Sequence, residues 1–442
     1  MYTSFIGKKF LDAWNAREGR DLTARRFFDE VMFPLFFDDE KHLLQVNNSK
    51  FVNPSIKGTN SEKLELLHEE IKKAVTTYKP NGAFYVGYGV SDPKEGTSGQ
   101  ITSTKILFDE EECYSSWIGA AFGMGLDGGN CILVNDADFL LAIHEGWKFY
   151  RKYLKETPNF KGRQLEAWNA QWFANYLING YDPFFYPKES KAKADDDSEK
   201  DNDKEKMLAT VRWSEMVMAL CLKIPSQTMT IYAYKLGKTN TTLGFLNLKL
   251  QEVHTMFEVR DHYFLDQKDS ILTDKQIQEL EPLFGFKRAC EQGVIGLRAL
   301  QPAKLHDYLP QRGDKKPKDF KITDAKSNQQ FHLFKLWIYA MLNKTELLEM
   351  AGHIASVLRD FESKSERGKA GNRQLSDEIR NATNLRAFVD KLSELIAQHP
   401  AAATADFYSK MEQVIKMPTD QLPLFVTLIR FNYNFQEAQI RN

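Results

Sequence analysis

Hydrophobic periodicity at the end of the chain constrains the fold more than any other sequence feature. From about residue 331 the apolar residues recur with the 3.6-residue period of α-helices, in segments such as HLFKLWIYAML and LLEMAGHIASVLRDF. Short polar stretches separate these segments, so we expect about four or five antiparallel helices that form a bundle over residues 331–442. The last segment, QLPLFVTLIRF, has an unbroken apolar run that fits a strand as well as a helix.

Before residue 331 the chain opens with helical patterns. Ile6, Phe10 and Trp14 recur every fourth residue and predict an N-terminal helix. A second helix is expected to begin after Asp21 as its N-cap and to stop at Pro34. A third is expected over the segment SEKLELLHEEIKKAV.

Strand patterns follow these helices. AFYVGYGV, which begins at Ala83, and the short apolar run Cys131–Val134 both predict strands. Residues Asn135–Asp138 offer N-caps for a helix that follows the second of them. TMTIYAYKLG and LGFLNLKL predict two further strands, joined through Lys238–Thr242.

Length and charge patterning indicate more than one domain. A chain of 442 residues exceeds what one hydrophobic core usually organises. Residues 188–206 contain no apolar residue larger than alanine and predict a flexible charged insertion, because they cannot bury surface to offset their ordering entropy. We therefore expect an α+β protein with a mixed N-terminal domain in two parts, residues 1–187 and 207–330, followed by the helical bundle.

Composition excludes several classes of protein. The 59 Lys and Arg residues balance 60 Asp and Glu residues, which excludes a globally basic nucleic-acid coat. The four cysteines, at positions 113, 131, 221 and 290, form no CxxC unit and predict neither a disulfide framework nor a zinc site. Lys8 and Lys9 interrupt the N-terminus before a signal peptide could form, and no window is apolar enough to span a membrane. We expect a cytoplasmic location.

Motifs for catalysis are weak. The nine histidines include no HxxxH pair, and the chain has neither a GxSxG elbow nor a Cys–His motif of known type. Gly123, Gly125 and Gly128 match the letters of the dinucleotide fingerprint, but they precede the predicted strand at Cys131 instead of following one. Close backbone packing and a flexible binding loop are the alternatives for these glycines. We expect binding without catalysis, and no metal or other cofactor.

Local basic clusters are the positive signal for a nucleic-acid partner. The stretch from Gly285 to Ser327 contains ten Lys or Arg residues but only five Asp or Glu residues. The loop Ser363–Arg373 contains four basic residues and one Glu. Glycine-containing basic loops suit contacts with phosphates. Solvated surface loops are the alternative interpretation of both clusters.

The connection Lys238–Thr242 carries short hydrogen-bonding side chains and one cation. A tip held between two strands could enter a DNA groove, where Asn and Lys side chains address base edges. The alternative is a structural turn stabilised by its Thr and Asn side chains.

Several segments together resemble a known family. YSSWIGAAFGMGLDGG, WKFYRKYL, EAWNAQW and above all YAYKLGKTNTTLGF are similar to large subunits of CRISPR type I surveillance complexes (Cascade), most closely to the compact I-A and I-B group. The zinc-binding cysteine pairs of some relatives are missing here.

This resemblance implies a non-catalytic subunit that sits at the 5′ end of a guide RNA among other Cascade subunits. Such a subunit inspects the short motif (PAM) that flanks the target in double-stranded DNA, helps to open the DNA and recruits a separate helicase–nuclease. No membrane is involved. A defence-system nuclease or hydrolase, or a helical scaffold without nucleic acid, are the alternatives. The implied motif-inspecting residues are Gly125, Asp127, Gly128, Asn130, Lys238, Thr239, Asn240 and Thr241, and the implied phosphate-binding residues are Lys315, Lys316, Lys318, Lys364, Arg367, Lys369 and Arg373.

Overall fold

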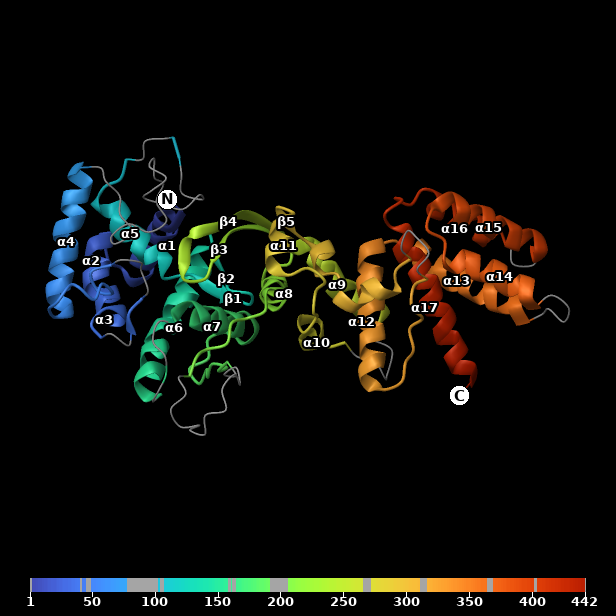
Figure 1. The fold of residues 1–442 in the computed structure, drawn as a ribbon, viewed down its shortest axis with the longest axis horizontal. Coiled ribbons are helices and arrows are strands. Elements are labelled where there is room, and N and C mark those ends of the chain that lie inside the picture. Colours follow the sequence, from blue (N-terminus) through green and yellow to red (C-terminus); the bar gives the residue numbers. More distant parts are fainter. Residues whose placement is uncertain are drawn as a thin grey trace. The chain divides into compact units, whose positions relative to one another are not determined.

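The fold is α+β and consists of two compact units (Figure 1). The first comprises Met1–Leu250 with Gly285–Ile295, and the second comprises Gln251–Phe284 with Gly296–Asn442. The computed structural model describes residues 2–39, 42–44, 49–77, 102–103, 107–157, 160, 164–190, 206–264, 272–310, 316–363, 369–400 and 404–441, with the backbone alone at 238–240, 369–371, 406 and 436–441.

A five-stranded sheet forms the centre of the first unit. Its strands follow the spatial order β1-β2-β3-β4-β5, and the first three pairings are antiparallel while β4 and β5 are parallel. The strands are β1 (Met124–Leu126), β2 (Asn130–Val134), β3 (Thr228–Lys235), β4 (Lys238–Lys249) and β5 (Val294–Ile295).

The first unit also contains helices. They are α1 (Tyr2–Glu18), α2 (Ala24–Phe27), a π-helical turn (Phe28–Met32), α3 (Phe33–Phe36), α4 (Asn60–Thr77), α5 (Glu110–Ala120), α6 (Ala137–Glu156), α7 (Leu165–Asn179), α8 (Trp213–Lys223) and α11 (Phe286–Cys290). Helices α1 and α5 cross closely at Gly119. A methyl group on Gly119 would lie only 1.8 Å from the carbonyl oxygen of Thr3. Only glycine allows this approach.

The expected helix at the N-terminus and those that became α4 and α6 are confirmed, as is the strand at β2, and Asp136 caps α6. Two details of the second helix were wrong. Thr23 is its N-cap, because the Thr23 hydroxyl accepts the bond from the Arg26 amide, and the helical path continues through Pro34 to Phe36. Pro34 lies in the first turn of α3, after a π-helical turn, where the amide that proline lacks is not needed. The strand expected from Ala83 lies outside the described residues.

The second unit is helical. Its elements are α9 (Leu250–Tyr263, except for its first residue), α10 (Asp274–Gln278), the 3₁₀ turns η3 (Leu297–Leu300) and η4 (Ala303–Tyr308), α12 (Ala325–Leu342), α13 (Thr345–Ser363), α14 (Lys369–Arg380), α15 (Leu385–Gln398), α16 (Ala405–Ile415) and α17 (Leu422–Arg441). The final segment, for which the sequence left strand and helix open, is a helix. The boundary expected at residue 331 falls inside α12, so the helical unit begins before it.

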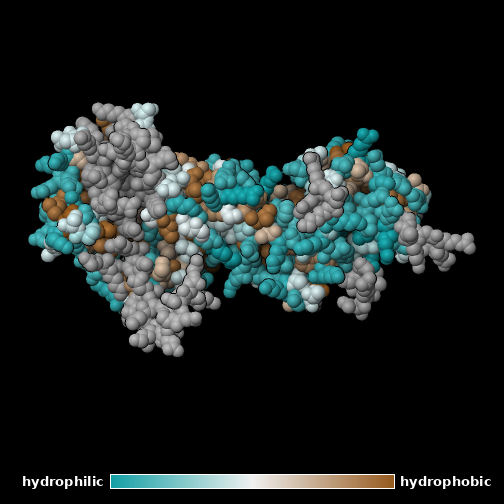
Figure 2. All heavy atoms as spheres, viewed as in Figure 1, coloured by the Kyte–Doolittle hydropathy of each residue, from teal (hydrophilic) through white to brown (hydrophobic). Residues whose placement is uncertain are grey.

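Hydrophilic residues cover most of the visible face of α12–α17 (Figure 2). Within the described residues, no helix has both the length and the apolar composition needed to cross a bilayer.

Candidate nucleic-acid interface

Two turns that are far apart in the sequence lie side by side at one end of the sheet. Strands β2 and β3 run antiparallel, and their ladder ends with Asn130 opposite Lys235. The turn after β1 and the turn after β3 therefore meet, and the amide of Leu236 donates a hydrogen bond to the carbonyl of Gly129 over 3.0 Å. The structure thus brings together the two segments expected to inspect DNA, Gly125–Asn130 and Lys238–Thr241.

Glycines shape both turns. Gly128, Gly129 and Gly237 have φ angles of 72°, 68° and 69°, which favour glycine over any residue with a side chain. Gly128 and Gly129 are exposed, and a methyl group placed on Gly129 or Gly237 would meet nothing within 4 Å. Another molecule can therefore approach the backbone of these turns closely.

The expectation that Lys238–Thr242 forms the connecting tip was wrong. The turn consists of Leu236 and Gly237, and β4 already begins at Lys238. Gly237 alone supplies the positive φ that a tight hairpin requires, whereas the β-branched threonines favour the strand.

The start of β4 is nevertheless irregular. Lys238 pairs with Lys235, while Thr242 pairs with Tyr234, so three residues of β4 face a single step of β3. Such a bulge re-aims side chains and disrupts the ladder locally. Thr241 is exposed, whereas the side chains of Lys238, Thr239 and Asn240 lie outside the described part of the chain.

Asp127 and Asn130 use their side chains within the protein. Asn130 is buried, and its amide nitrogen donates to the carbonyl of Asp127 over 3.0 Å while its oxygen accepts a bond from the Lys235 ammonium at 3.0 Å. The Asp127 carboxylate accepts the amide of Trp213 at 3.2 Å, and its burial raises the pKa of this carboxyl. Both residues therefore hold the turn in place and leave Gly128 and Gly129 to face solvent.

Asn169 supports the segment that precedes β1. This buried residue of α7 donates to the carbonyls of Ala121 and Gly123 over 2.7 and 2.9 Å and accepts the indole N–H of Trp147 over 3.2 Å. All of these bonds position the chain that leads into β1. The sequence analysis did not predict a role for Asn169 or Lys235. Asn169 could have been found, because it is a polar residue within the largely apolar run EAWNAQWF.

Packing accounts for the fingerprint-like glycines. A methyl group on Gly123 would lie 2.2 Å from the hydroxyl of Tyr234 and 2.9 Å from the sulfur of Cys131. Gly125 lies within β1, which leads into the hairpin with β2 and not into a helix. A dinucleotide needs a strand-to-helix turn at this motif, so the structure favours the close-packing alternative.

The predicted phosphate-binding residues of the second unit occur in two segments. In the first segment Lys316 is exposed, whereas the ammonium of Lys318 bonds the Asp307 carboxylate at 2.7 Å, which raises the pKa of Lys318. Buried Arg430 of α17 fixes this segment, donating to the Lys318 carbonyl at 2.7 Å and to the Asp319 carboxylate at 2.9 Å. Lys315 lies outside the described residues.

The second segment was expected to be a loop, but part of it is helical. Helix α14 begins at Lys369 and includes exposed Arg373, because buried Leu375 and Ile379 give this stretch an apolar face. Among the described residues, no hydrogen bond or ring contact joins Arg373 to Lys316 or Lys318. Lys364 and Arg367 are outside the described residues, as is the side chain of Lys369.

Helix α17 contacts the first basic segment directly and the second through the end of α14. Arg430 bonds the first, and Tyr433, about one helical turn further on, lies 4.1 Å below the guanidinium of Arg380 at the end of α14. Helix α17 therefore supports both segments within the second unit.

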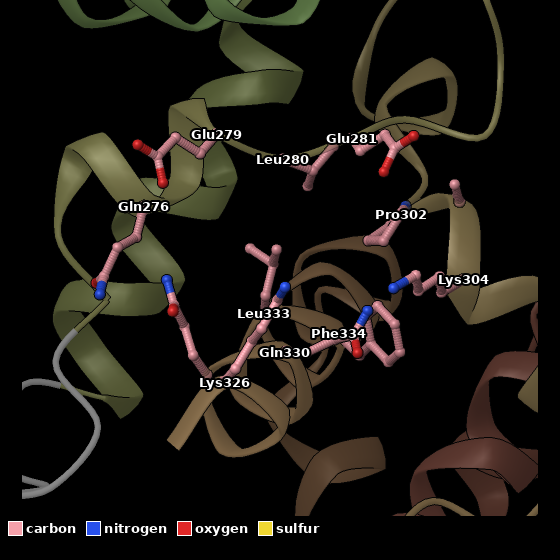
Figure 3. A pocket seen from close by; sticks show the side chains of 12 residues that line it. Gln276, Glu279, Leu280, Glu281, Pro302, Lys304, Lys326, Gln330, Leu333 and Phe334 are labelled. Carbon is pink, nitrogen blue, oxygen red and sulfur yellow. The ribbon is translucent and has the colours of Figure 1, made fainter. Parts of the chain in front are cut away.

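A cavity of about 260 Å³ lies elsewhere in the second unit, between α10, η4 and α12 (Figure 3). Its lining mixes carboxylates with lysines, namely Glu279, Glu281, Lys304 and Lys326, beside glutamines. None of the residues predicted to inspect the motif or to bind phosphate lines it, although Lys304 and Lys326 belong to the basic stretch Gly285–Ser327. Across the described residues, no group of three or more His, Cys, Asp or Glu side chains is placed to hold a metal ion.

Comparisons with known proteins find no relative for this chain: no family model, no curated protein and no solved structure matches it.

Proposed function

We propose that this protein is the non-catalytic large subunit of a cytoplasmic, RNA-guided DNA surveillance complex of the Cascade type. In this role it inspects the motif that flanks the target in double-stranded DNA, helps to open the DNA and recruits a helicase–nuclease. The supporting observation is the meeting of the Gly128–Gly129 turn with the start of β4 at one end of the sheet.

The geometry suits inspection of a duplex. Two glycine turns with exposed backbone allow a close approach to the sugar–phosphate chain, and the bulged start of β4 carries the Lys and Asn side chains that can address base edges. Asp127, Asn130 and Lys235 act as positioning residues, since their side chains hold the turns from inside.

A near-neutral chain is compatible with this function. In an RNA-guided complex base pairing reads the sequence, and the protein reads only a short motif and the shape of the backbone. Exposed Lys316 and Arg373 of the second unit would add phosphate contacts, whereas Lys318 shares its charge with Asp307.

The first experiment is purification of the tagged protein from its native host, with sequencing of the RNA and identification of the proteins that accompany it. We expect a stable multi-subunit particle that contains short RNAs with one common, repeat-derived 5′ end. A protein that emerges alone and free of RNA would contradict the proposal, and metal-dependent cleavage of DNA by the purified chain would favour the nuclease alternative.

A further inference from the structure

The segment that follows α7 exposes three aromatic rings. Phe184 is 90% exposed, Tyr186 69% and Tyr181 48%. These rings, here called the aromatic platform, lie within six residues of one another, and clustered exposed apolar groups commonly mark an interaction site.

Packing and hydrogen bonds hold the backbone of the aromatic platform in place. Phe185 points inward and contacts the rings of Trp168 and Trp172 edge-on, with centroids 5.4 Å away from each. Phe185 is half-buried and Pro187 is buried, so exposure alternates along residues 184–188 and Phe184, Tyr186 and Lys188 share the outer side. The backbone of Lys188 is fixed by Gln171, whose side chain accepts its amide at 2.6 Å and donates to its carbonyl at 2.9 Å. The rings are therefore held outward before any partner binds.

The platform lies along helix α6 of the same unit. Tyr181 contacts Phe149 with ring centroids 6.0 Å apart, and Tyr186 contacts Tyr153 at 5.5 Å. The ammonium of Lys148 lies 5.9 Å from the centroid of the Tyr181 ring. Aromatic rings and cations thus follow the same line.

The charge of this surface favours an anionic partner. Lys148, Lys155 and Lys188 are exposed, and none of them forms an ion pair with another described residue. Of the nearby acidic groups, Glu156 pairs with Lys152 at 3.9 Å and Glu189 with Lys206 at 3.5 Å, while the Asp182 carboxylate accepts the amide of Phe184 at 2.9 Å. Exposed rings beside unpaired lysines are the combination with which proteins bind single strands by stacking bases and tracking phosphates.

We infer that the aromatic platform binds single-stranded nucleic acid, with bases stacked on Phe184 and Tyr186 and phosphates held by the neighbouring lysines. Side chains two residues apart on an extended segment are about 6.6 Å apart, roughly twice the rise per base of a stacked strand. Bases would therefore have to separate to occupy both rings; a single strand does this freely, whereas a duplex must unstack its base pairs at a cost of about a few kcal/mol per step. The inference rests on the proposed function for the class of partner and adds a second site to it.

The test compares the full chain with the double variant Phe184→Ala/Tyr186→Ala by fluorescence anisotropy. The probes are labelled oligothymidylate, oligouridylate, an abasic oligonucleotide of equal length and a duplex with the flanking motif. We expect the double variant to bind the oligonucleotides with bases at least about tenfold more weakly, because two stacking contacts are lost. Tyr408→Ala removes a ring that is 59% exposed on α16 and should leave binding unchanged.

The remaining arms separate this inference from its rivals. Phe184→Tyr/Tyr186→Phe should keep the affinity, and wild type and double variant should bind the abasic strand equally. A larger loss on one of the two base-containing strands identifies DNA or RNA as the natural ligand. The inference is overturned if the double variant binds both base-containing strands with unchanged affinity. It is also overturned if the double variant loses as much affinity for the duplex as for the single strands.

A protein-docking role is the rival. It would be indicated if the double variant loses a protein from the native particle while its oligonucleotide affinity is unchanged. If only the proposed function is wrong, the wild-type protein will bind the single strands but not the duplex that carries the flanking motif.

Discussion

His144 shows how one half-buried residue makes the stability of the first unit depend on pH. Its ring packs against Phe10 at 5.1 Å and Trp147 at 5.1 Å, and its Nδ1 atom is buried without a hydrogen-bond partner. Burial, followed by the nearby charges of Arg17 and Lys148, lowers the pKa of His144 to about 3. The folded protein therefore keeps this imidazole neutral well below the pH at which the unfolded chain takes up a proton.

The sign of the effect follows directly. Above the unfolded pKa of about 6.5 neither state carries the proton, so this contribution to stability is fully present. As the pH falls from about 6.5 towards 3 only the unfolded state binds the proton, and the free energy of unfolding decreases by about 2 kcal/mol by pH 5.

We predict that His144→Phe makes the free energy of unfolding of the first unit less dependent on pH between 7 and 5. Urea unfolding followed by tryptophan fluorescence at several pH values measures the difference in slope, which is independent of any constant packing cost of the larger ring. His262→Phe, at an exposed histidine of α9, is the control and should keep the wild-type slope. Identical slopes for His144→Phe and wild type would show that His144 does not titrate as proposed.

At the scale of elements, local patterns predicted most helices and strands but not their register. The apolar run Cys131–Val134 and the Asp136 cap are local signals, and both elements formed where they were expected. The bond between Lys235 and Asn130 joins residues 105 positions apart, and nothing in either neighbourhood specifies that pairing. The bulge in β4 likewise depends on how β3 pairs with it. For this reason the sequence-based prediction placed the turn at Lys238–Thr242 and not at Leu236 and Gly237.

We predict that Asn240, at the start of β4, discriminates between flanking motifs. Asn240→Ala should reduce discrimination between flanking motifs by roughly 1–3 kcal/mol if Asn240 makes a good base contact, because the bonds to the preferred base are lost. Electrophoretic or anisotropy titrations of the assembled complex with duplexes that differ only in the motif measure this difference.

The same strand offers the control. Asn247→Ala removes an exposed asparagine near the other end of β4, where its oxygen accepts a bond from the Thr230 hydroxyl at 2.8 Å. It should not change motif discrimination. Equal losses on all motifs for Asn240→Ala would mean that the start of β4 only positions the backbone, and no loss would restore a purely structural role.

At the scale of the whole molecule, the sequence predicted basic clusters but not which of their charges remain available. Charge counts along the chain treat Lys316 and Lys318 alike, yet Lys318 is bonded to Asp307 and Lys316 is not. Arg430 belongs to an apolar helix, and no local pattern links it to the segment that it fixes more than 100 positions earlier. Among the predicted phosphate-binding residues whose side chains the structure describes, exposed Lys316 and Arg373 are therefore the most able to reach a phosphate.

Salt dependence tests whether they do so. Each phosphate contact to duplex DNA contributes about 0.9 to the slope of log K against log salt. We predict that Lys316→Ala/Arg373→Ala lowers the magnitude of this slope by about two, in titrations of the assembled complex with target duplex at several salt concentrations. The loss of affinity should be similar for every flanking motif, because phosphates carry no sequence information.

The control removes the same charge from the same unit without removing a phosphate contact. Arg386 is 94% exposed on its side chain and lies 3.9 Å from Asp390, and Lys416 bonds Glu412 within α16 and its C-cap. If Arg386→Ala/Lys416→Ala lowers the slope as much as Lys316→Ala/Arg373→Ala does, the effect comes from net charge alone. A slope that changes only for Lys316→Ala/Arg373→Ala would place the DNA backbone along the two segments that α17 supports.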